Sequence, residues 1–196
     1  MSRPRERRPG KTYIFLGISG SGKGTQAEHL CRALLRAEIV STGAGFRRYA
    51  RNNNAVGRYI RGVLYRGDIM AYWAAAYMWL KEFFEHLKGS ENLIFEGAPR
   101  RIEEAHMMDD FMRDLGRPLP VAIHIRLSER VARERLLARG RSDDNRRAIA
   151  GRFRFFREYV AHVIDYYQRH GRLITVDGDA RPEAVWREIQ KKLRIR

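Results

Sequence analysis

A glycine-rich run between a strand pattern and a helix pattern constrains this chain more than any other feature. Residues 17–26 read Gly-Ile-Ser-Gly-Ser-Gly-Lys-Gly-Thr-Gln and follow the apolar, β-prone run 12–16. Apolar residues then recur at helical spacing, at Ala27, Leu30, Cys31, Leu34 and Leu35. These flanks predict a strand-to-helix turn in which backbone N–H groups, the helix dipole and the Lys23 charge cradle a phosphate.

The end of this loop departs from the common phosphate-binding pattern. A Ser or Thr usually follows the lysine directly, because its hydroxyl binds Mg²⁺. Here Gly24 intervenes, and Thr25 carries the hydroxyl that is expected near the metal. A flexible glycine turn without a ligand is the alternative, and the strand and helix patterns on either side disfavour it.

Length and composition indicate one globular domain. A chain of 196 residues can bury one good core. The single cysteine, Cys31, excludes an internal disulfide, and a small core residue is its expected role. The N-terminus has no apolar leader, and the charge-free apolar stretch 69–80 is too short to span a bilayer. We therefore expect a cytoplasmic protein without a membrane segment.

The formal net charge of +16 is the other global property of the chain. Arginines are spread along the sequence, and only the segment 1–11 forms a basic cluster, which its prolines and charge predict to be a disordered tail. No zinc knuckle, RNA-recognition signature or basic-region helix is present. A basic surface that attracts anionic substrates is expected, rather than dedicated nucleic-acid binding.

Five apolar runs have strand character, at residues 13–18, 39–40, 93–95, 121–127 and 173–176. Such runs separated by helices favour a parallel sheet. We therefore expect residues 12–196 to form one α/β domain of the P-loop NTPase type, with a five-stranded parallel sheet flanked by helices.

Helical patterns fill the segments between the strands. The block 42–88 is too long for a simple crossover and is interpreted as a substrate-binding flap. Its aromatic residues are expected to pack within the flap rather than to stack on bases; they are Tyr72, Trp73, Tyr77 and Trp79. A long helix over 149–167 is predicted, with Asp143 and Asp144 as its caps. The two aspartates are also expected to orient neighbouring arginines rather than to act as general bases.

Further motifs, in order along the chain, make it resemble the adenylate kinase family from about residue 12 to residue 193. They are Ser41-Thr42-Gly43, Gly67-Asp68-Ile69-Met70, Glu96-Gly97-Ala98-Pro99-Arg100, Arg135 with Arg139, and Arg141-Ser142-Asp143-Asp144-Asn145 with Arg152. Each is weak alone, but their order and spacing together with the glycine-rich loop are specific.

The resemblance implies reversible phosphoryl transfer from ATP to AMP, in which bidentate guanidinium groups position and neutralise the phosphates. The residues that it implies as catalytic are Lys23, Arg100, Arg139, Arg141 and Arg152. Those implied for ATP are Gly20, Ser21, Gly22, Lys23, Gly24, Thr25, Arg135 and Arg139. Those implied for AMP are Thr42, Gly43, Arg47, Met70, Gly97, Arg100, Glu104, Arg141 and Arg152. Thr25 and Glu96 would hold Mg²⁺, the expected cofactor, through water.

Two acidic residues depart from the family pattern. Glu96 stands where the family usually has Asp, and Glu104 stands where a glutamine usually faces the AMP adenine. An ionised glutamate only accepts hydrogen bonds, and guanine offers two donors. AMP remains the expected acceptor because Thr42 and the other motifs are retained. The alternative is that Glu104 turns away and pairs with Arg101 or another arginine.

The third departure is the lid. Only Gly140, Arg141 and Ser142 separate Arg139 from Asp143, so a very short or absent lid is expected at 139–144. The four cysteines of zinc-lid members are absent, and no zinc is expected.

We therefore expect a monomeric, Mg²⁺-dependent adenylate kinase. One alternative is the same fold acting on GMP or a pyrimidine nucleotide. The other, suggested by the charge, is a nucleic-acid-associated protein with a nucleotide-binding core.

Overall fold

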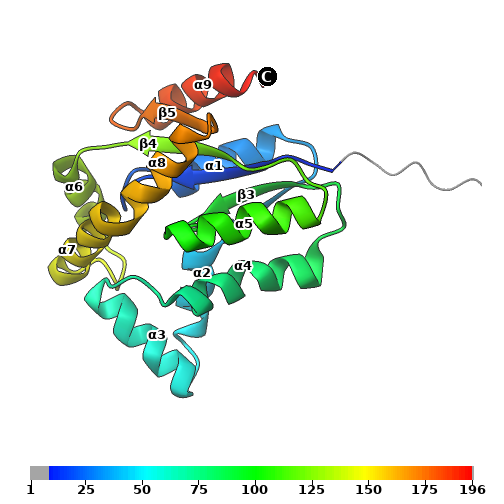
Figure 1. Cartoon of the computed structure of the whole chain (residues 1–196). Helices are drawn as coiled ribbons and strands as arrows, with labels where there is room; N and C mark the ends of the chain where they lie inside the picture. The colour runs from blue at the N-terminus through cyan, green and yellow to red at the C-terminus, as the bar shows by residue number, and fades with distance from the viewer. Residues whose placement is uncertain (1–8, 196) are drawn as a thin grey trace, which may run out of the picture.

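The five predicted strands pair into a single parallel sheet in the computed structural model, which describes residues 9–195 (Figure 1). The strands are β1 (Thr12–Leu16), β2 (Ala37–Ser41), β3 (Asn92–Glu96), β4 (Val121–Arg126) and β5 (Leu173–Asp177). Their order is β2-β3-β1-β4-β5, and Ile14 of β1 pairs with Phe95 of β3 and Ala122 of β4. The predicted α/β fold is confirmed.

The intervening segments are helical. The helices are α1 (Lys23–Ala33), α2 (Thr42–Tyr49), α3 (Ala55–Arg66), α4 (Tyr72–His86), α5 (Ile102–Asp114), α6 (Glu129–Arg139), α7 (Arg146–Phe155), the π-helical segment η1 (Phe156–Val160), α8 (Ala161–Arg169) and α9 (Pro182–Leu193). Within residues 9–195, no helix combines the length and apolarity that crossing a membrane requires. Leu35, expected on the first helix, lies beyond the end of α1 and is exposed.

Helices cover both faces of the sheet because successive side chains of a strand point to opposite sides. Tyr13 and Phe15 of β1 belong to a core cluster with residues of α1 and α9. Ile14 and Leu16 belong to the cluster on the other face, with residues of α4, α5 and α8. The central strand is thereby buried on both sides, and the two layers fix the position of its carboxyl end.

The insertion between β2 and β3 folds as α2, α3 and α4 (Figure 1). These helices enclose their own apolar cluster of Phe46, Ile60, Val63, Met70, Ala74, Ala75 and Met78. Gly45 packs against this cluster so closely that a Cβ there would lie 2.0 Å from Cε of Met78. The flap is therefore a small packed unit attached to the sheet.

The long helix expected over 149–167 is confirmed, because α7, η1 and α8 follow one another without a break. Its expected cap was wrong: Asn145 caps α7 by accepting the N–H of Ala148 at 2.8 Å. Asp143 and Asp144 are therefore not the caps, because their carboxylates pair with arginines instead.

The tail expected at residues 1–11 lies mostly outside the described residues. Its last two residues are held by hydrogen bonds. Arg117 Nη2 donates to the carbonyl of Gly10 at 3.0 Å, and the N–H of Lys11 donates to Oδ1 of Asn92 at 2.9 Å. Gly10 and Lys11 therefore belong to the folded domain.

Glycines allow the flap to contact α7 backbone to backbone. Gly67 ends α3 with φ +70°, and a Cβ there would lie 2.0 Å from the carbonyl oxygen of Ala148. A Cβ on Gly151 would lie 2.7 Å from the carbonyl oxygen of Arg66. Any larger residue at either position must push α3 away from α7.

We expect Gly67→Ala to lower the free energy of unfolding by more than about 2 kcal/mol, since the left-handed backbone costs a non-glycine residue about 1 kcal/mol and the clash adds to it. Chemical denaturation measures the loss. Gly140→Ala is the matched control, because Gly140 has φ +65° and nothing within 4 Å of an added Cβ. Equal losses in the two variants would show that α3 and α7 are not in close contact.

Candidate active site

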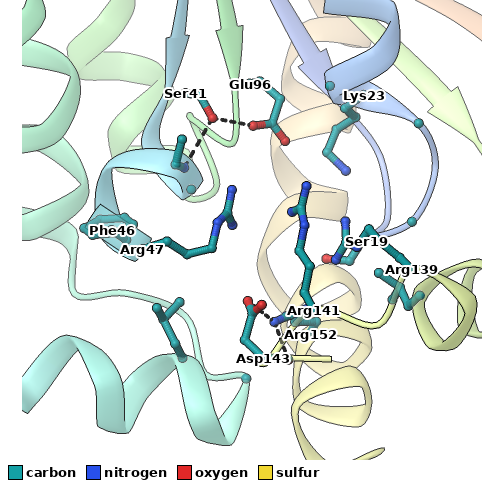
Figure 2. Close-up of a pocket in the computed structure, with 18 of the residues that line it drawn as sticks. Ser19, Lys23, Ser41, Phe46, Arg47, Glu96, Arg139, Arg141, Asp143 and Arg152 are labelled. Atoms are coloured by element: carbon teal, nitrogen blue, oxygen red, sulfur yellow. Dashed lines mark hydrogen bonds and ion pairs between the residues drawn. The ribbon is translucent and has the colours of Figure 1, made fainter. Parts of the chain in front are cut away.

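A cavity of about 550 Å³ opens where the glycine-rich loop, the flap and the α6–α7 segment meet (Figure 2). Three strand ends lead into it, because β1 continues into the loop, β2 ends at Ser41 and β3 ends at Glu96. Open α/β sheets bind ligands in the crevice at the carboxyl ends of their strands. The predicted site residues that line it are Gly20, Gly22, Lys23, Gly24, Thr25, Gly43, Arg47, Met70, Glu96, Arg100, Arg135, Arg139, Arg141 and Arg152.

The glycine-rich loop has the strand-loop-helix geometry that its flanks predicted. Gly20 and Gly22 adopt φ of +90° and +91°, which let the chain fold tightly around the start of α1. Lys23 Nζ donates to the carbonyl oxygens of Gly17 at 2.9 Å and Ile18 at 2.8 Å. Burial lowers the pKa of Lys23 to about 8; Arg100 and Arg139 act in the same direction and Glu96 opposes them. The ammonium is therefore still charged at neutral pH.

Glu96 is the carboxylate at the end of β3. Its Oε2 accepts a hydrogen bond from the hydroxyl of Ser41 at 2.7 Å (Figure 2). Burial alone would raise the pKa of Glu96, but the charges of Lys23, Arg100 and Arg47 and the Ser41 hydrogen bond together hold it below its usual value. The carboxylate is therefore ionised at neutral pH.

Magnesium suits these donors. Within residues 9–195, no three His, Cys, Asp or Glu side chains lie close enough together to form a metal site by themselves. Mg²⁺ is usually bound by one or two protein oxygens together with water and substrate phosphates. The Thr25 hydroxyl and the Glu96 carboxylate, which both line the cavity, fit that pattern.

Positive charge dominates the cavity. Seven basic side chains line it, against the four carboxylates of Glu28, Asp68, Glu96 and Asp143. Arg47 of α2 faces the arginines of the α6–α7 segment across the cavity (Figure 2). Burial and the charge of Arg141 lower the pKa of Arg47, and burial and Arg152 do the same for Arg100. Such convergence of like charges is unfavourable until an anion enters.

Two aspartates hold part of this arginine cluster in place. Asp144, with a side chain only 1% exposed, pairs with Arg139 at 2.9 Å and with Arg152 at 2.7 Å. Asp143 pairs with Arg152 at 2.6 Å. Burial would raise the pKa of Asp144, but its hydrogen bonds to the two guanidinium groups lower it overall. Within residues 9–195, the side chains of Arg47, Arg100 and Arg141 make no ion pair.

Four predicted site residues do not line the cavity: Ser21, Thr42, Gly97 and Glu104. Thr42 is buried and donates its hydroxyl to the carbonyl of Gly97 at 2.9 Å, which ties the flap to the end of β3. Glu104 is also buried, and its Oε2 accepts the backbone N–H of Arg100 at 3.0 Å. Burial raises the pKa of Glu104. The expectation that Glu104 faces the acceptor base is not met in this structure.

Sequence reasoning missed the apolar wall of the cavity. Ile39, Phe46 and Leu64 line it together with Met70, and apolar side chains of this kind suit the face of a planar ring. Phe155 also lines it, and the guanidinium of Arg100 lies 5.6 Å from the centre of its ring. Phe155 has the same helical spacing as the buried residues of α7, so its sequence position predicts only a core residue. Its contact with Arg100 becomes visible only in the structure.

Comparisons with known proteins agree with this geometry. The family model described as Adenylate kinase matches residues 15–172. Adenylate kinase 1 of Synechocystis sp. is 32% identical over 181 residues, covering 92% of this chain and 96% of that protein. An adenylate kinase of Corynebacterium urealyticum is 33% identical, covering 88% and 93%. One of Thermus thermophilus is 32% identical, covering 95% and 98%.

The paired aspartates generate a prediction about stability. We expect Asp144→Asn to lower the free energy of unfolding by about 3 kcal/mol at neutral pH, because it leaves two guanidinium groups without their buried counter-charge. Since the pKa of Asp144 is lowered by folding, this contribution is present at neutral pH and is lost as acid protonates the group.

Asp110→Asn is the matched control for chemical denaturation. Asp110 also pairs with an arginine, at 2.6 Å to Arg113, but both side chains are more than half exposed. Its loss should cost less than about 0.5 kcal/mol. An equally small change in Asp144→Asn would contradict a structural role for the Asp144 cluster.

Proposed function

Because the chain belongs to the adenylate kinase family, we propose that its cavity binds ATP with Mg²⁺ and AMP together and transfers the γ-phosphoryl group between them. The chain is an enzyme of the adenylate kinase type, and its reaction converts ATP and AMP into two molecules of ADP. The finer assignments below rest on the geometry of the cavity.

The observation that carries the proposal is the set of seven basic side chains around one cavity at the strand ends. Two nucleotides bring several phosphate charges together, and the transferring group spreads its charge over three oxygens. Fixed cations in a water-poor site stabilise that charge more strongly than water does, because they need no reorganisation. A site with this charge is poorly suited to a neutral or cationic substrate.

We infer that ATP binds at the glycine-rich loop. The backbone around Gly20 and Gly22 faces the cavity, and Lys23 can exchange its carbonyl partners on Gly17 and Ile18 for phosphate oxygens. Arg135 is held on the same side by hydrogen bonds from Nη1 to the carbonyl of Gly178 at 2.8 Å and from Nη2 to that of Asp179 at 3.4 Å. Its guanidinium plane is thereby available for stacking on a base.

We infer that AMP binds between the flap and the end of β3. Arg47 and Arg100 would hold its phosphate, since neither has another ion-pair partner among residues 9–195. The base would lie on Phe46 and Met70. Glu104 supports this site indirectly, by fixing the backbone of Arg100.

Thr25 and Glu96 are the residues proposed to hold Mg²⁺. When bound, the ion would neutralise phosphate charge and orient the oxygens of ATP. The protein's part is to keep Glu96 ionised through Lys23 and the Ser41 hydroxyl.

The loop between α6 and α7 is proposed as the minimal lid. Arg141 is exposed on it, whereas Arg139 and Arg152 at its two sides are held by Asp144. We propose that Arg141 moves onto the phosphates and that the other two act from nearly fixed positions.

Since one chain supplies all of these groups, we propose a monomer, acting in the cytoplasm where its nucleotide substrates occur.

Glu104 does not face the cavity, so its carboxylate is not presented to the two donors that guanine would offer. AMP is therefore the proposed acceptor. With ATP and Mg²⁺, initial rates for AMP, GMP, CMP, UMP and dTMP test this choice. AMP should give the highest kcat/KM; a higher value for GMP would assign the enzyme to guanylate.

We expect Lys23→Ala and Arg100→Ala each to lower kcat/KM for phosphoryl transfer by about two orders of magnitude or more, because each removes a charge aimed at phosphate. A coupled assay of ADP formation measures the loss. Arg133→Ala is the matched control, since Arg133 lies 5.2 Å from the ring of Phe153 but outside the cavity. Folded Lys23→Ala with normal turnover would refute the loop's role.

Glu104 provides a second kinetic test. We expect Glu104→Gln to keep AMP turnover within about threefold of the wild type, because an amide oxygen can accept the Arg100 N–H as the carboxylate does. Glu104→Leu should lower turnover, because it leaves that N–H buried without an acceptor. A selective loss of AMP over GMP activity in Glu104→Gln would show that Glu104 contacts the base.

A further inference from the structure

The flap carries exposed aromatic side chains outside the nucleotide cavity. Of the four residues expected to pack within the flap, only Trp79 is fully buried, whereas Trp73 is 62% and Tyr77 54% exposed. Tyr59 of α3 is 41% exposed. We call Tyr49, Tyr59, Trp73 and Tyr77 the aromatic surface of the flap; none of the four lines the cavity.

These rings form one continuous surface. Tyr59 stacks on Trp73 with ring centres 6.1 Å apart and planes inclined by 22°. Trp73 and Tyr77 are four residues apart on α4 and therefore lie on the same face of that helix. Lys81, four residues after Tyr77 on α4, donates through Nζ to the hydroxyl of Tyr49 at 3.3 Å and lies 5.9 Å from the centre of its ring. The surface thus crosses from α3 over α4 to the end of α2.

Two of the three flap helices, α2 and α3, are strongly basic, whereas α4 carries Lys81 together with Glu82 and Glu85. Residues 42–67 contain six arginines and no aspartate or glutamate. Three of the six have other contacts: Arg47 lines the cavity, Arg61 binds the carbonyls of Ala50 and Asn52, and Arg66 pairs with Asp68. The remaining three are exposed, and within residues 9–195 they make no ion pair; they are Arg48, Arg51 and Arg58. Arg48 lies 5.6 Å from the ring centre of Tyr49.

Exposed rings beside unpaired guanidinium groups fit a particular kind of partner. A second copy of this chain, with a net charge of +16, would bring like charges together. Single-stranded nucleic acid offers both complements, because its bases stack on aromatic rings and its phosphates pair with arginine.

We propose that the aromatic surface of the flap binds single-stranded nucleic acid, with bases on Tyr59, Trp73 and Tyr77 and phosphates on Arg48, Arg51 and Arg58. The site is separate from the catalytic cavity, so its occupation does not require removal of ATP or AMP. The surface lies on the element that is proposed to bind the acceptor nucleotide. Nucleic acid and adenylate kinase activity would therefore be linked through the position of the flap.

The test is fluorescence anisotropy of a labelled oligothymidylate of about twelve nucleotides, which exceeds the length that the surface can contact. The full chain is used, with excess ADP in the buffer to fill the catalytic cavity. We expect binding that weakens steeply with salt. Trp73→Leu should raise Kd about tenfold without changing the salt slope, since it removes stacking and not charge.

Tyr65→Leu is the matched control for the ring. Tyr65 of α3 is 64% exposed, but it lies six residues after Tyr59 and therefore on another face of that helix. It should leave Kd unchanged. Arg58→Glu should weaken binding more than Arg187→Glu, which makes the same charge change on α9. Retained adenylate kinase activity and an unchanged far-ultraviolet circular dichroism spectrum show that each variant is folded.

Three results would overturn the proposal. One is the absence of measurable binding at low salt. Another is equal weakening by Arg58→Glu and Arg187→Glu with none by Trp73→Leu, which would indicate only the attraction of a basic protein to a polyanion. The third is that the protein binds vesicles containing phosphatidylserine, and that Trp73→Leu abolishes this binding but leaves binding to oligothymidylate intact. That result would assign the surface to membranes.

Discussion

The mutual repulsion of basic side chains in one cavity is the constraint on which the rest of this structure depends. Lys23 and six arginines line a space that holds only four carboxylates. Glu96 and the Asp143–Asp144 pair offset part of that repulsion, and they also fix which groups are neutralised. Arg47, Arg100 and Arg141 keep no ion-pair partner among residues 9–195 and are therefore the groups that we propose to bind phosphate.

The fold supplies this arrangement with elements that are individually rigid. The central strand is buried on both faces, so the loop that follows it starts from a fixed point. The flap has its own apolar cluster and touches α7 through Gly67 and Gly151, while Thr42 ties it to Gly97. Arg47 is thus carried by the flap, and the arginines of the α6–α7 segment lie on the opposite side of the cavity (Figure 2).

Local patterns predicted the parts of the site that local chemistry determines. The strand run, the glycines and Lys23 specify the phosphate loop without reference to the rest of the chain. The cap of α7 at Asn145, the inward turn of Glu104 and the place of Phe155 beside Arg100 could not be predicted, because each depends on tertiary partners. The expectation that Trp73 and Tyr77 pack within the flap was wrong for the same reason. Apolar residues on a helix are buried only when a neighbouring element covers that face.

The pH dependence of kcat/KM for ATP tests most directly whether burial, together with the nearby Arg100 and Arg139, controls the charge of Lys23 in the cavity. Because these effects lower the pKa of Lys23 to about 8 in the free enzyme, kcat/KM should fall above that pH, by about tenfold per pH unit. Lys23→Arg should be slower but show no such break, since guanidinium does not titrate in this range. A wild-type profile that stays flat to about pH 10, the usual range of an unperturbed lysine, would contradict the account.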